Sequence, residues 1–320
     1  MSSVERDETL PGNSIVKKRP VRNLVASVHQ RLLNKAAQAG EDAQYVLIRY
    51  GLERLLYRLS RSKHAEQFVM KGAMLFLVWT GETYRPTKDV DLLAIQSASR
   101  AQFKKIFQDI CGVAVVEDGL VFLSETVRAE DIREEETYHG VRVTLEGRLG
   151  KAKIPLQIDI GLGDAITPSP QQANFPTLLD FPSPRLTMYP KETVVAEKFE
   201  TMARRGIASS RMRDYYDVYA LSQEFEFDGE ILSDAIRATC KRRRTDIGSD
   251  VPYALTSDFA TDALKQRQWQ AFQRRGRLKL RVNDLKNVVS TIRDFLMPAV
   301  QAVREGRAFK SHWSKGGQWR

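Results

Sequence analysis

Residues 85–93 read Arg-Pro-Thr-Lys-Asp-Val-Asp-Leu-Leu, and a strand predicted over 90–95 begins within this stretch, which carries two acids. Successive side chains of a strand alternate between its two faces, so Asp89 and Asp91 point the same way. Two carboxylates so close together repel each other and raise each other's pKa. A cation relieves that cost, and Mg²⁺ commonly binds one or two carboxylates together with substrate phosphates. The alternative is a solvent-facing strand end that carries two acids without a function.

A possible phosphate-binding turn lies upstream of the two acids. Residues 68–70 predict a short buried strand, and Gly72-Ala73 follows it and opens an apolar helical run. A glycine there lets backbone N–H groups approach a phosphate, and a helix N-terminus favours anions. Lys71 and Arg85 place positive charge on either side of this position. The alternative interpretation of Gly72-Ala73 is an ordinary tight turn.

The part of the chain that follows the two acids is rich in predicted strands. After a helix near 101–110, extended segments are expected at 113–116, 120–123, 140–145 and 154–160, with glycines at the turns between them. Asp159 interrupts the last, otherwise apolar, segment and could join the acidic cluster as a third metal ligand, or it could lie on an exposed strand face. Residues 163–190 hold six prolines, which predicts a long irregular connection between two lobes.

After this connection the chain is mostly helical. Helices are expected at 191–205, 212–223, 229–240, 257–274 and 282–304. Lys198 falls on the apolar face of the first of them, where a lysine either extends to solvent or reaches an anion between the lobes. Asp214 and Asp217 lie three residues apart on the second helix. They could hold Lys198, bind a base, position a metal or merely complement the helix dipole.

The ends of the chain suggest further divisions. Residues 1–20 are polar and are expected to form a flexible arm, and two helices near 21–40 and 45–59 are expected to pack as a pair. The last residues, 306–320, contain lysines and arginines but no acid after Gly306, and they predict a mobile basic tail. We therefore divide the chain into the arm, a lobe over 21–185, a helical lobe over 186–305 and the tail.

Composition limits the classes of protein that need to be considered. The 320 residues include 42% hydrophobic residues, and 50 Lys and Arg against 40 Asp and Glu give a net charge of +10. Such an excess favours an anionic partner, and nucleic acid is the first candidate, although a basic surface without a partner is the alternative. The two cysteines and four histidines lack the spacing of a disulfide framework or a zinc site. Because no signal peptide and no long apolar segment is evident, a cytoplasmic protein is expected.

The chain resembles the AbiEii/AbiGii nucleotidyltransferase-like toxin family, which belongs to the DNA polymerase β-type nucleotidyltransferase superfamily. The resemblance is carried by 68–75 (FVMKGAML), 84–93 (YRPTKDVDLL), 158–163 (IDIGLG) and 192–221 (ETVVAEKFETMARRGIASSRMRDYYDVYAL). It implies an α+β protein with two lobes, in which a mixed-sheet nucleotidyltransferase lobe precedes a mainly helical C-terminal lobe. The superfamily prefers Gly or Ser at the position of Ala73, so a hydroxyl that could hold phosphate is missing here.

The resemblance also assigns roles to the residues singled out above. It implies a nucleoside triphosphate substrate and Mg²⁺ held by acids of the sheet. We expect a catalytic set and a nucleotide-binding set that share one residue. The catalytic set is Asp89, Asp91, Lys198 and Asp214, the metal ligands are Asp89, Asp91 and Asp159, and the nucleotide-binding set is Lys71, Gly72, Ala73, Arg85, Lys198 and Asp217.

In biological terms the resemblance implies a toxin of a toxin–antitoxin or abortive-infection system, with a cognate antitoxin as partner. We expect it to transfer NMP from an NTP to an acceptor such as a tRNA 3′ end. The basic residues expected to contact this RNA are Arg204, Arg205, Arg211, Arg213, Lys241, Arg242, Arg243 and Arg244, although the last four could be a solvated helix end. The alternatives are nucleotide transfer to a protein, or a non-catalytic RNA-binding or interaction protein with a decayed site.

Overall fold

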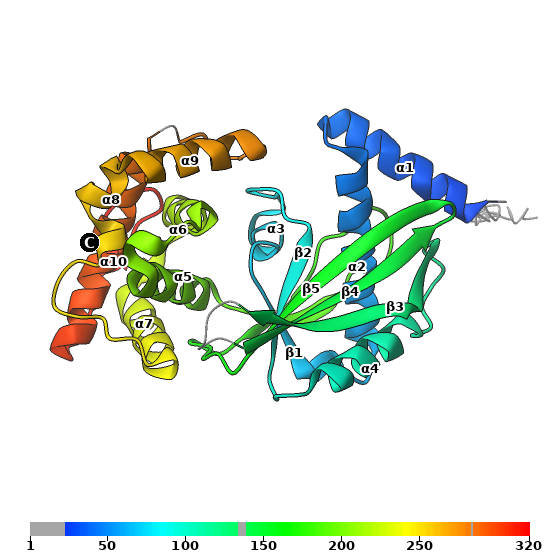
Figure 1. The fold of residues 1–320 in the computed structure, drawn as a ribbon, viewed down its shortest axis with the longest axis horizontal. Coiled ribbons are helices and arrows are strands. Elements are labelled where there is room, and N and C mark those ends of the chain that lie inside the picture. Colours follow the sequence, from blue (N-terminus) through cyan, green and yellow to red (C-terminus); the bar gives the residue numbers. More distant parts are fainter. Residues whose placement is uncertain (1–22, 134–138, 283) are drawn as a thin grey trace, which may run out of the picture.

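Two lobes lie side by side in the computed structural model, which describes residues 23–133, 139–282 and 284–320 (Figure 1). The first lobe is a mixed β-sheet with its accompanying helices, and the second consists almost entirely of helices. This arrangement confirms the predicted α+β class with a sheet lobe followed by a helical lobe.

In the described residues, seven strands form the sheet in the order β3-β4-β5-β2-β1-β7-β6. Their bounds are Phe68–Lys71 (β1), Asp89–Ala94 (β2), Leu120–Arg133 (β3), His139–Leu149 (β4), Ala152–Leu162 (β5), Gln171–Asn174 (β6) and Arg185–Met188 (β7). Strand β2 pairs parallel with β5, and β1 pairs parallel with β7, whereas the other neighbours are antiparallel. The sheet is therefore mixed, and β2 lies near its centre.

Four charged residues lie in one row across the centre of the sheet. Lys71 on β1 is the register partner of Asp91 on β2, Asp91 is the partner of Asp159 on β5, and Asp159 is the partner of Arg142 on β4. Their apolar neighbours along the strands are buried on the opposite face. Since side chains alternate along each strand, one face of the sheet packs the core and the other presents this charged row.

Helices cover the sheet and build the second lobe. The helices of the sheet lobe are Leu24–Ala39 (α1), Ala43–Arg61 (α2), Leu75–Thr80 (α3) and Arg100–Cys111 (α4). The helical lobe contains Lys191–Arg205 (α5), Met212–Glu224 (α6), Gly229–Arg243 (α7), Ser257–Thr261 (α8), Ala263–Arg275 (α9) and Leu285–Glu305 (α10). Helix α2 packs on β5 and β7, and α4 packs on β3.

Most of the expected helices are present, but the one expected over 257–274 is two helices. The side chain of Asp262 accepts hydrogen bonds from the backbone N–H groups of Leu264 and Lys265, both at 2.9 Å, and so caps the start of α9. An aspartate at this position satisfies backbone donors that would otherwise lack a partner. The apolar spacing continues through Asp262, which is why the periodicity alone predicted one helix.

Two predictions about extended and irregular segments are wrong. Residues 113–116 form no strand; they precede β3 without a neighbouring strand, and Val116 is 63% exposed. The proline-rich connection over 163–190 contains β6 and β7, which extend the sheet beyond β1. The backbone N–H of Tyr189 donates to the carbonyl of Met70 at 2.9 Å. Strand β7 also crosses the predicted lobe boundary between residues 185 and 186.

The tail over 306–320 is ordered, which corrects the expectation of a mobile segment. Strand β9 (His312–Trp313) pairs with β8 (Phe227–Asp228), and the indole N–H of Trp313 donates to the carbonyl of Ser222 at 2.8 Å. Trp313 is only 2% exposed, and Trp319 stacks on Phe295. The large apolar area of these aromatic side chains stabilises the tail on the helical lobe despite its charge.

The arm predicted over 1–20 lies outside the described residues, so the structure does not test it. Among the helices that are described, none combines the length and the apolar character needed to cross a bilayer.

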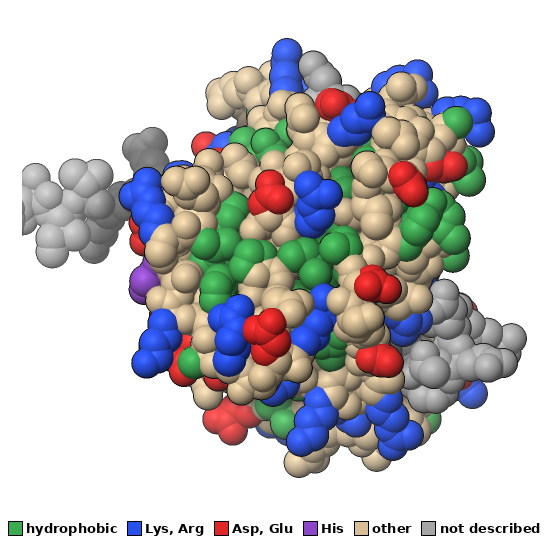
Figure 2. Space-filling view, turned by 90° about the vertical axis from the view of Figure 1, so that its left-hand side faces the viewer, with side chains coloured by type: hydrophobic (Ala, Val, Ile, Leu, Met, Phe, Trp, Pro, Cys, Tyr) green, Lys and Arg blue, Asp and Glu red, His purple; other side chains and the backbone are tan. Residues whose placement is uncertain are grey.

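Figure 2 views the outer end of the helical lobe, where basic and acidic side chains are interspersed around a hydrophobic patch. The excess of basic residues is therefore not gathered into one band at this end.

Candidate active site

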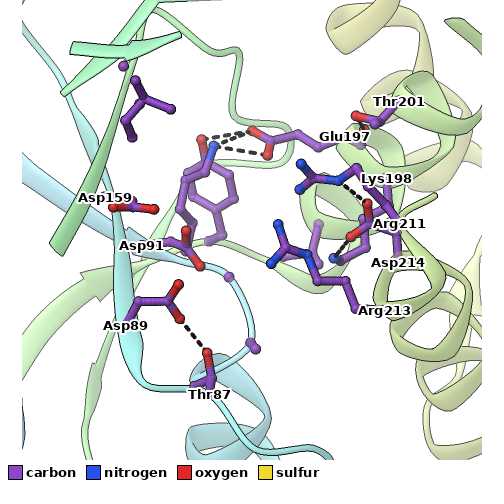
Figure 3. A pocket seen from close by; sticks show the side chains of 18 of the residues that line it. Thr87, Asp89, Asp91, Asp159, Glu197, Lys198, Thr201, Arg211, Arg213 and Asp214 are labelled. Carbon is purple, nitrogen blue, oxygen red and sulfur yellow. Dashed lines mark hydrogen bonds and ion pairs between the residues drawn. The ribbon is translucent and has the colours of Figure 1, made fainter. Parts of the chain in front are cut away.

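A pocket of about 330 Å³ lies where the sheet meets helices α5 and α6. Figure 3 shows three aspartates of β2 and β5 on one wall of this pocket, facing side chains of α5 and α6 on the other. The pocket therefore joins segments more than a hundred residues apart in the chain. The sequence-predicted residues that line it are Lys71, Gly72, Ala73, Arg85, Asp89, Asp91, Asp159, Lys198, Arg204, Arg205, Arg211, Arg213, Asp214 and Arg243.

Asp89 and Asp91 form the acidic part of the sheet wall. The hydroxyl of Thr87 donates to Oδ1 of Asp89 at 2.5 Å, and this contact fixes the carboxylate at the start of β2. Burial, followed by the charge of Asp89, raises the pKa of Asp91 to about 6. A carboxylate whose ionisation is opposed in this way is one that a nearby cation would stabilise.

Gly72 gives Asp91 the room that it occupies. The backbone of Gly72 is in the left-handed region at φ 81°, which favours glycine. A Cβ atom at this position would lie 1.9 Å from Oδ2 of Asp91, far inside any permitted contact. The predicted tight turn is therefore also a close approach between the backbone and an acid, and the next residue, Ala73, lines the pocket beside it.

Asp159 differs from the other two aspartates because it is already neutralised. Arg142 donates to both of its carboxylate oxygens, at 2.8 and 2.7 Å, and Gln157 donates to Oδ1 at 3.2 Å. Within the described ranges, no three His, Cys, Asp or Glu side chains are grouped closely enough to hold a metal ion between them. The structure thus brings Asp159 next to Asp91 in register, but in an ion pair with Arg142.

The donor set fits a hard divalent cation that shares its ligands with a substrate. Asp89 and Asp91 offer two carboxylates on one face, and burial, followed by the charge of Asp89, raises the pKa of Asp91. Mg²⁺ prefers oxygen ligands and commonly binds through one or two carboxylates, with phosphates and water completing its coordination. A complete cage of protein ligands is not needed for such a site.

Lys198 provides the principal cation on the helical wall. Its ammonium donates to Oδ1 of Asp214 at 2.7 Å and forms an ion pair with Oδ2 of Asp217 at 2.9 Å. Arg211 donates to the other oxygen of Asp214 at 2.7 Å. Burial alone would raise the pKa of Asp214, but the charges of Lys198 and Arg211 outweigh it and hold that pKa below its usual range. Of the roles suggested for Asp214 and Asp217, the structure shows one, which is to hold Lys198.

Asp217 lies behind the pocket wall. It is fully buried, and Arg85 donates to its two carboxylate oxygens at 2.8 and 2.9 Å. Burial raises the pKa of Asp217, but Arg85 and Lys198 outweigh this effect and lower it. The structure therefore places the predicted nucleotide-binding residue Asp217 beneath two cations that line the pocket, where it holds their side chains in position.

Lys71 is held by acids that the sequence analysis did not single out. Its ammonium donates to Asp164 at 2.8 Å and to both oxygens of Glu197 at 3.1 and 3.0 Å. The hydroxyl of Tyr189 also donates to Glu197, at 3.1 Å. Glu197 precedes Lys198 on α5, and Asp164 directly follows the IDIGLG segment, so proximity to those motifs was the only available signal. These contacts tie β1 to α5 across the pocket.

The basic residues predicted to contact RNA divide into two groups. Those at the end of α5 and the start of α6 line the pocket, and Arg243 joins them from α7. Arg243 forms ion pairs with Asp164 at 3.0 Å and Glu200 at 2.7 Å. Arg242 donates to the carbonyl of Gly163. Lys241 and Arg244 are exposed outside the pocket. Residues 241–244 therefore do not form one uniform basic cluster.

Positive charge predominates in this pocket. Among the described residues that line it, nine are Lys or Arg and five are Asp or Glu. Because low-dielectric walls concentrate the resulting field, such a pocket attracts a multiply charged anion. A metal-bound polyphosphate matches both walls, because carboxylates suit its metal and cations suit its phosphates.

Comparisons with known proteins identify the family of the chain. A family model described as the nucleotidyl transferase AbiEii toxin of type IV toxin–antitoxin systems matches residues 54–296, well over half of the chain. No curated protein matches the chain.

Two solved structures from Helicobacter pylori are similar over most of their length. JHP933 has a TM-score of 0.45 and 12% identity, covering 79% of this chain and 90% of that chain. The other, whose description reads "putative nucleotidyltransferase", has a TM-score of 0.43 and 11% identity, covering 80% of this chain and 95% of that chain.

Proposed function

The chain belongs to the AbiEii nucleotidyl transferase toxin family of type IV toxin–antitoxin systems, and we propose that it transfers a nucleoside monophosphate from an NTP to an RNA 3′ end with Mg²⁺. The family implies an NTP substrate and an antitoxin partner; the metal, the acceptor and the residue roles are our proposal. One observation carries it: Asp89 and Asp91 share a pocket with Lys198, although this lysine is more than a hundred residues away in the chain.

The sheet wall holds the metal in this proposal. Asp89 and Asp91 bind Mg²⁺, and Gly72 leaves the space that Asp91 needs for this task. A metal held by these carboxylates would supply positive charge, which stabilises the negative charge that develops on the phosphate oxygens. The backbone N–H groups near Gly72 and Ala73 face the phosphates, so the missing hydroxyl at position 73 removes one contact but not the backbone donors. Asp159 acts as a third ligand only if its ion pair with Arg142 opens.

The helical wall holds the triphosphate. Lys198 contacts it and keeps its position through Asp214 and Asp217, while Arg85 is aligned by the buried Asp217. The acceptor hydroxyl attacks the α-phosphorus in line. A new P–O bond forms, the bond to the β-phosphate oxygen breaks, pyrophosphate leaves, and the hydroxyl proton passes to water. The cations of this wall stabilise the negative charge of the departing pyrophosphate.

The choice of RNA as acceptor is supported by the basic residues at the mouth of the pocket. Arg204 and Arg205 end α5, and Arg211 and Arg213 begin the next helical segment, so four arginines gather where an acceptor strand would enter. Phosphates of a single strand can pair with such guanidinium groups, and this binding weakens steeply with salt. Lys241, Arg242 and Arg244 lie outside the pocket and would contact RNA beyond its 3′ end.

Incubation with each labelled NTP, Mg²⁺ and total RNA tests the reaction directly. We expect label in RNA, a loss of at least about a thousandfold for Asp89→Asn and Asp91→Asn, and a loss of about tenfold for Asp159→Asn because Arg142 already neutralises it. Transfer by Asp89→Asn or Asp91→Asn at the wild-type rate would refute the proposal. Labelled protein that survives ribonuclease would identify a protein acceptor, and absence of Mg²⁺-dependent NTP binding in calorimetry would identify a decayed site.

The acceptor proposal has its own test in the salt dependence of RNA binding. Arg213→Gln should raise the KM for RNA and lower the slope of log KM against log salt by about one, since one phosphate contact is lost. Arg100→Gln, on α4 and outside the pocket, is the matched control and should change neither quantity. Equal values for both variants would argue against RNA at this pocket.

A further inference from the structure

The segment before β2 contacts the helical lobe through three consecutive residues, 84–86. The hydroxyl of Tyr216 on α6 donates to the carbonyl of Tyr84 at 2.9 Å. Arg85 pairs with Asp217, the residue next to Tyr216. A Cβ atom on Gly276 would lie only 3.0 Å from the ring of Pro86, so the backbone after α9 also passes close to this segment.

The chain that follows α9, residues 276–282, completes this contact, and we name it the strap. The backbone N–H of Lys279 donates to the carbonyl of Tyr84 at 3.0 Å, and its ammonium lies 4.7 Å from the centre of the Tyr84 ring. The backbone N–H of Leu280 donates to the hydroxyl of Tyr216 at 3.0 Å. Tyr216 therefore donates to the sheet lobe and accepts from the strap through a single oxygen atom.

The position of this hydroxyl connects the two walls of the pocket. Tyr84 lies five residues before Asp89, and Tyr216 lies two residues after Asp214 on the same helix. Tyr216 is fully buried, so no water competes for its hydrogen bonds. Packed elements transmit small displacements instead of absorbing them. A change at the contact between Tyr216 and Tyr84 would thus alter the separation of the acids from Lys198.

We infer that Tyr216 is a positioning residue, whose buried hydroxyl, together with the strap, sets the separation between the carboxylates of β2 and the Lys198–Asp214 pair. The expected effect on catalysis rests on the proposed function, whereas the hydrogen bond between Tyr216 and Tyr84 does not depend on that function. In-line transfer is sensitive to small errors in the placement of reacting groups, whereas binding of the flexible triphosphate tolerates them better. The turnover rate should therefore suffer more than nucleotide affinity.

The neighbouring tyrosine offers a matched control. Tyr215 is also fully buried, and its hydroxyl donates to the carbonyl of Ala254 at 3.1 Å, within the helical lobe. Tyr216→Phe and Tyr215→Phe each remove one buried hydroxyl from adjacent residues of α6. Only Tyr216→Phe removes a hydrogen bond between the lobes.

The experiment compares the two variants with the wild type in transfer rate, KM for NTP and thermal unfolding. We expect both variants to unfold at somewhat lower temperature, but only Tyr216→Phe to lose about tenfold or more in kcat, with the KM for NTP changed less than about threefold. Equal kcat values for the two variants would overturn the inference. Equally high values would show that the contact does not affect turnover, and equally low values would show a general loss of stability.

Hydrogen exchange separates this inference from the proposed reaction. Backbone amides of residues 82–91 should exchange faster in Tyr216→Phe than in Tyr215→Phe, since only the former releases this segment from the helical lobe. A wild-type protein that transfers no nucleotide would overturn the proposed function, while faster exchange confined to Tyr216→Phe would still support the positioning contact. Equal exchange in the two variants would overturn that contact.

Discussion

Asp91 on β2 lies directly opposite Asp159 on the parallel strand β5, yet the two carboxylates have different surroundings. Arg142 neutralises Asp159 through two hydrogen bonds. Lys71, the register partner of Asp91 on its other side, donates instead to Asp164 and Glu197. Burial, followed by the charge of Asp89, opposes the ionisation of Asp91, and the charge of Lys71 offsets this only in part.

This difference predicts a pH-dependent gain in stability for Asp91→Asn in metal-free protein. The pKa of Asp91 is raised to about 6 in the folded state from its ordinary value near 3.8, so ionisation above pH 6 opposes folding. We expect the variant to be more stable than the wild type at pH 7–8, on the order of 2 kcal/mol. The gain should shrink as pH falls from 6 to 4, because the wild-type carboxylate then becomes neutral. Denaturant unfolding across this range measures it, and a variant less stable at every pH would contradict the prediction.

Gly72→Ala should inactivate the protein, whereas Gly81→Ala should not. Both glycines have positive φ, at 81° and 76°, so an alanine at either position carries a similar backbone cost of about 1–2 kcal/mol. At Gly72 the new methyl group would also strike Asp91, while at Gly81 nothing lies within 4 Å. We expect a loss of transfer of more than about a hundredfold for Gly72→Ala alone. Similar rates for the two variants would show that the close approach to Asp91 is unimportant.

Lys198→Met should impair both activity and stability. It leaves Asp214 and Asp217 buried without their shared ammonium, a change that costs on the order of 3 kcal/mol. Because the pKa values of both acids are lowered in the folded protein, this contribution is present above about pH 4 and is lost as pH falls through their lower folded values. The difference in free energy of unfolding between the wild type and Lys198→Met should therefore be smaller at pH 3 than at pH 7.

Lys191→Met, on the same helix, is the control for that prediction. Lys191 pairs with Glu192 at 2.7 Å, but its side chain is 30% exposed. Its partner Glu192 is only 7% exposed, so Lys191→Met leaves one buried carboxylate without its cation and should lower the free energy of unfolding. Transfer should stay intact, because Lys191 does not line the pocket. Loss of transfer in both variants would mean that the charge of Lys198 has no specific role.

The ordered tail predicts a stability effect without a catalytic one. Trp313→Ala empties a buried site and should cost about 3–5 kcal/mol, whereas Lys315→Ala, whose side chain is 62% exposed, should cost less than about 1 kcal/mol. Neither residue lines the pocket, so transfer per folded molecule should be unchanged. Thermal unfolding and transfer rates at a temperature where both variants are folded measure these effects. A mobile tail would make the two variants equally stable.

The sequence analysis succeeded where a pattern is local. The helix predicted over 191–205 has those bounds in the structure, because its apolar spacing and the glycine that ends it are both near in sequence. The shared face of Asp89 and Asp91 follows from strand alternation alone. The strands β6 and β7 were missed because prolines surround them and because β7, on which β6 pairs, is itself paired with β1, more than a hundred residues earlier in the chain.

The roles of individual charges were harder to predict than their location. Lys71, Arg85 and Lys198 were all expected near the pocket, and they line it. The sequence offered Asp214 and Asp217 as possible partners of Lys198, but it did not indicate the partners of the other two, which are Glu197 and Asp164 for Lys71 and the buried Asp217 for Arg85. Several acids compete for each cation, and only their final distances decide between them.

The amino-acid order by itself determined most of the helices, the central strands and which charged side chains share a strand face, since these depend on residues within a few positions of one another. Tertiary structure alone decided that Lys71 pairs with Asp164 and Glu197, that Asp217 is buried beneath two cations, and that the aromatic tail is fixed. Each of these outcomes depends on burial and on a neighbour contributed by another segment, and neither exists until those segments have packed against each other.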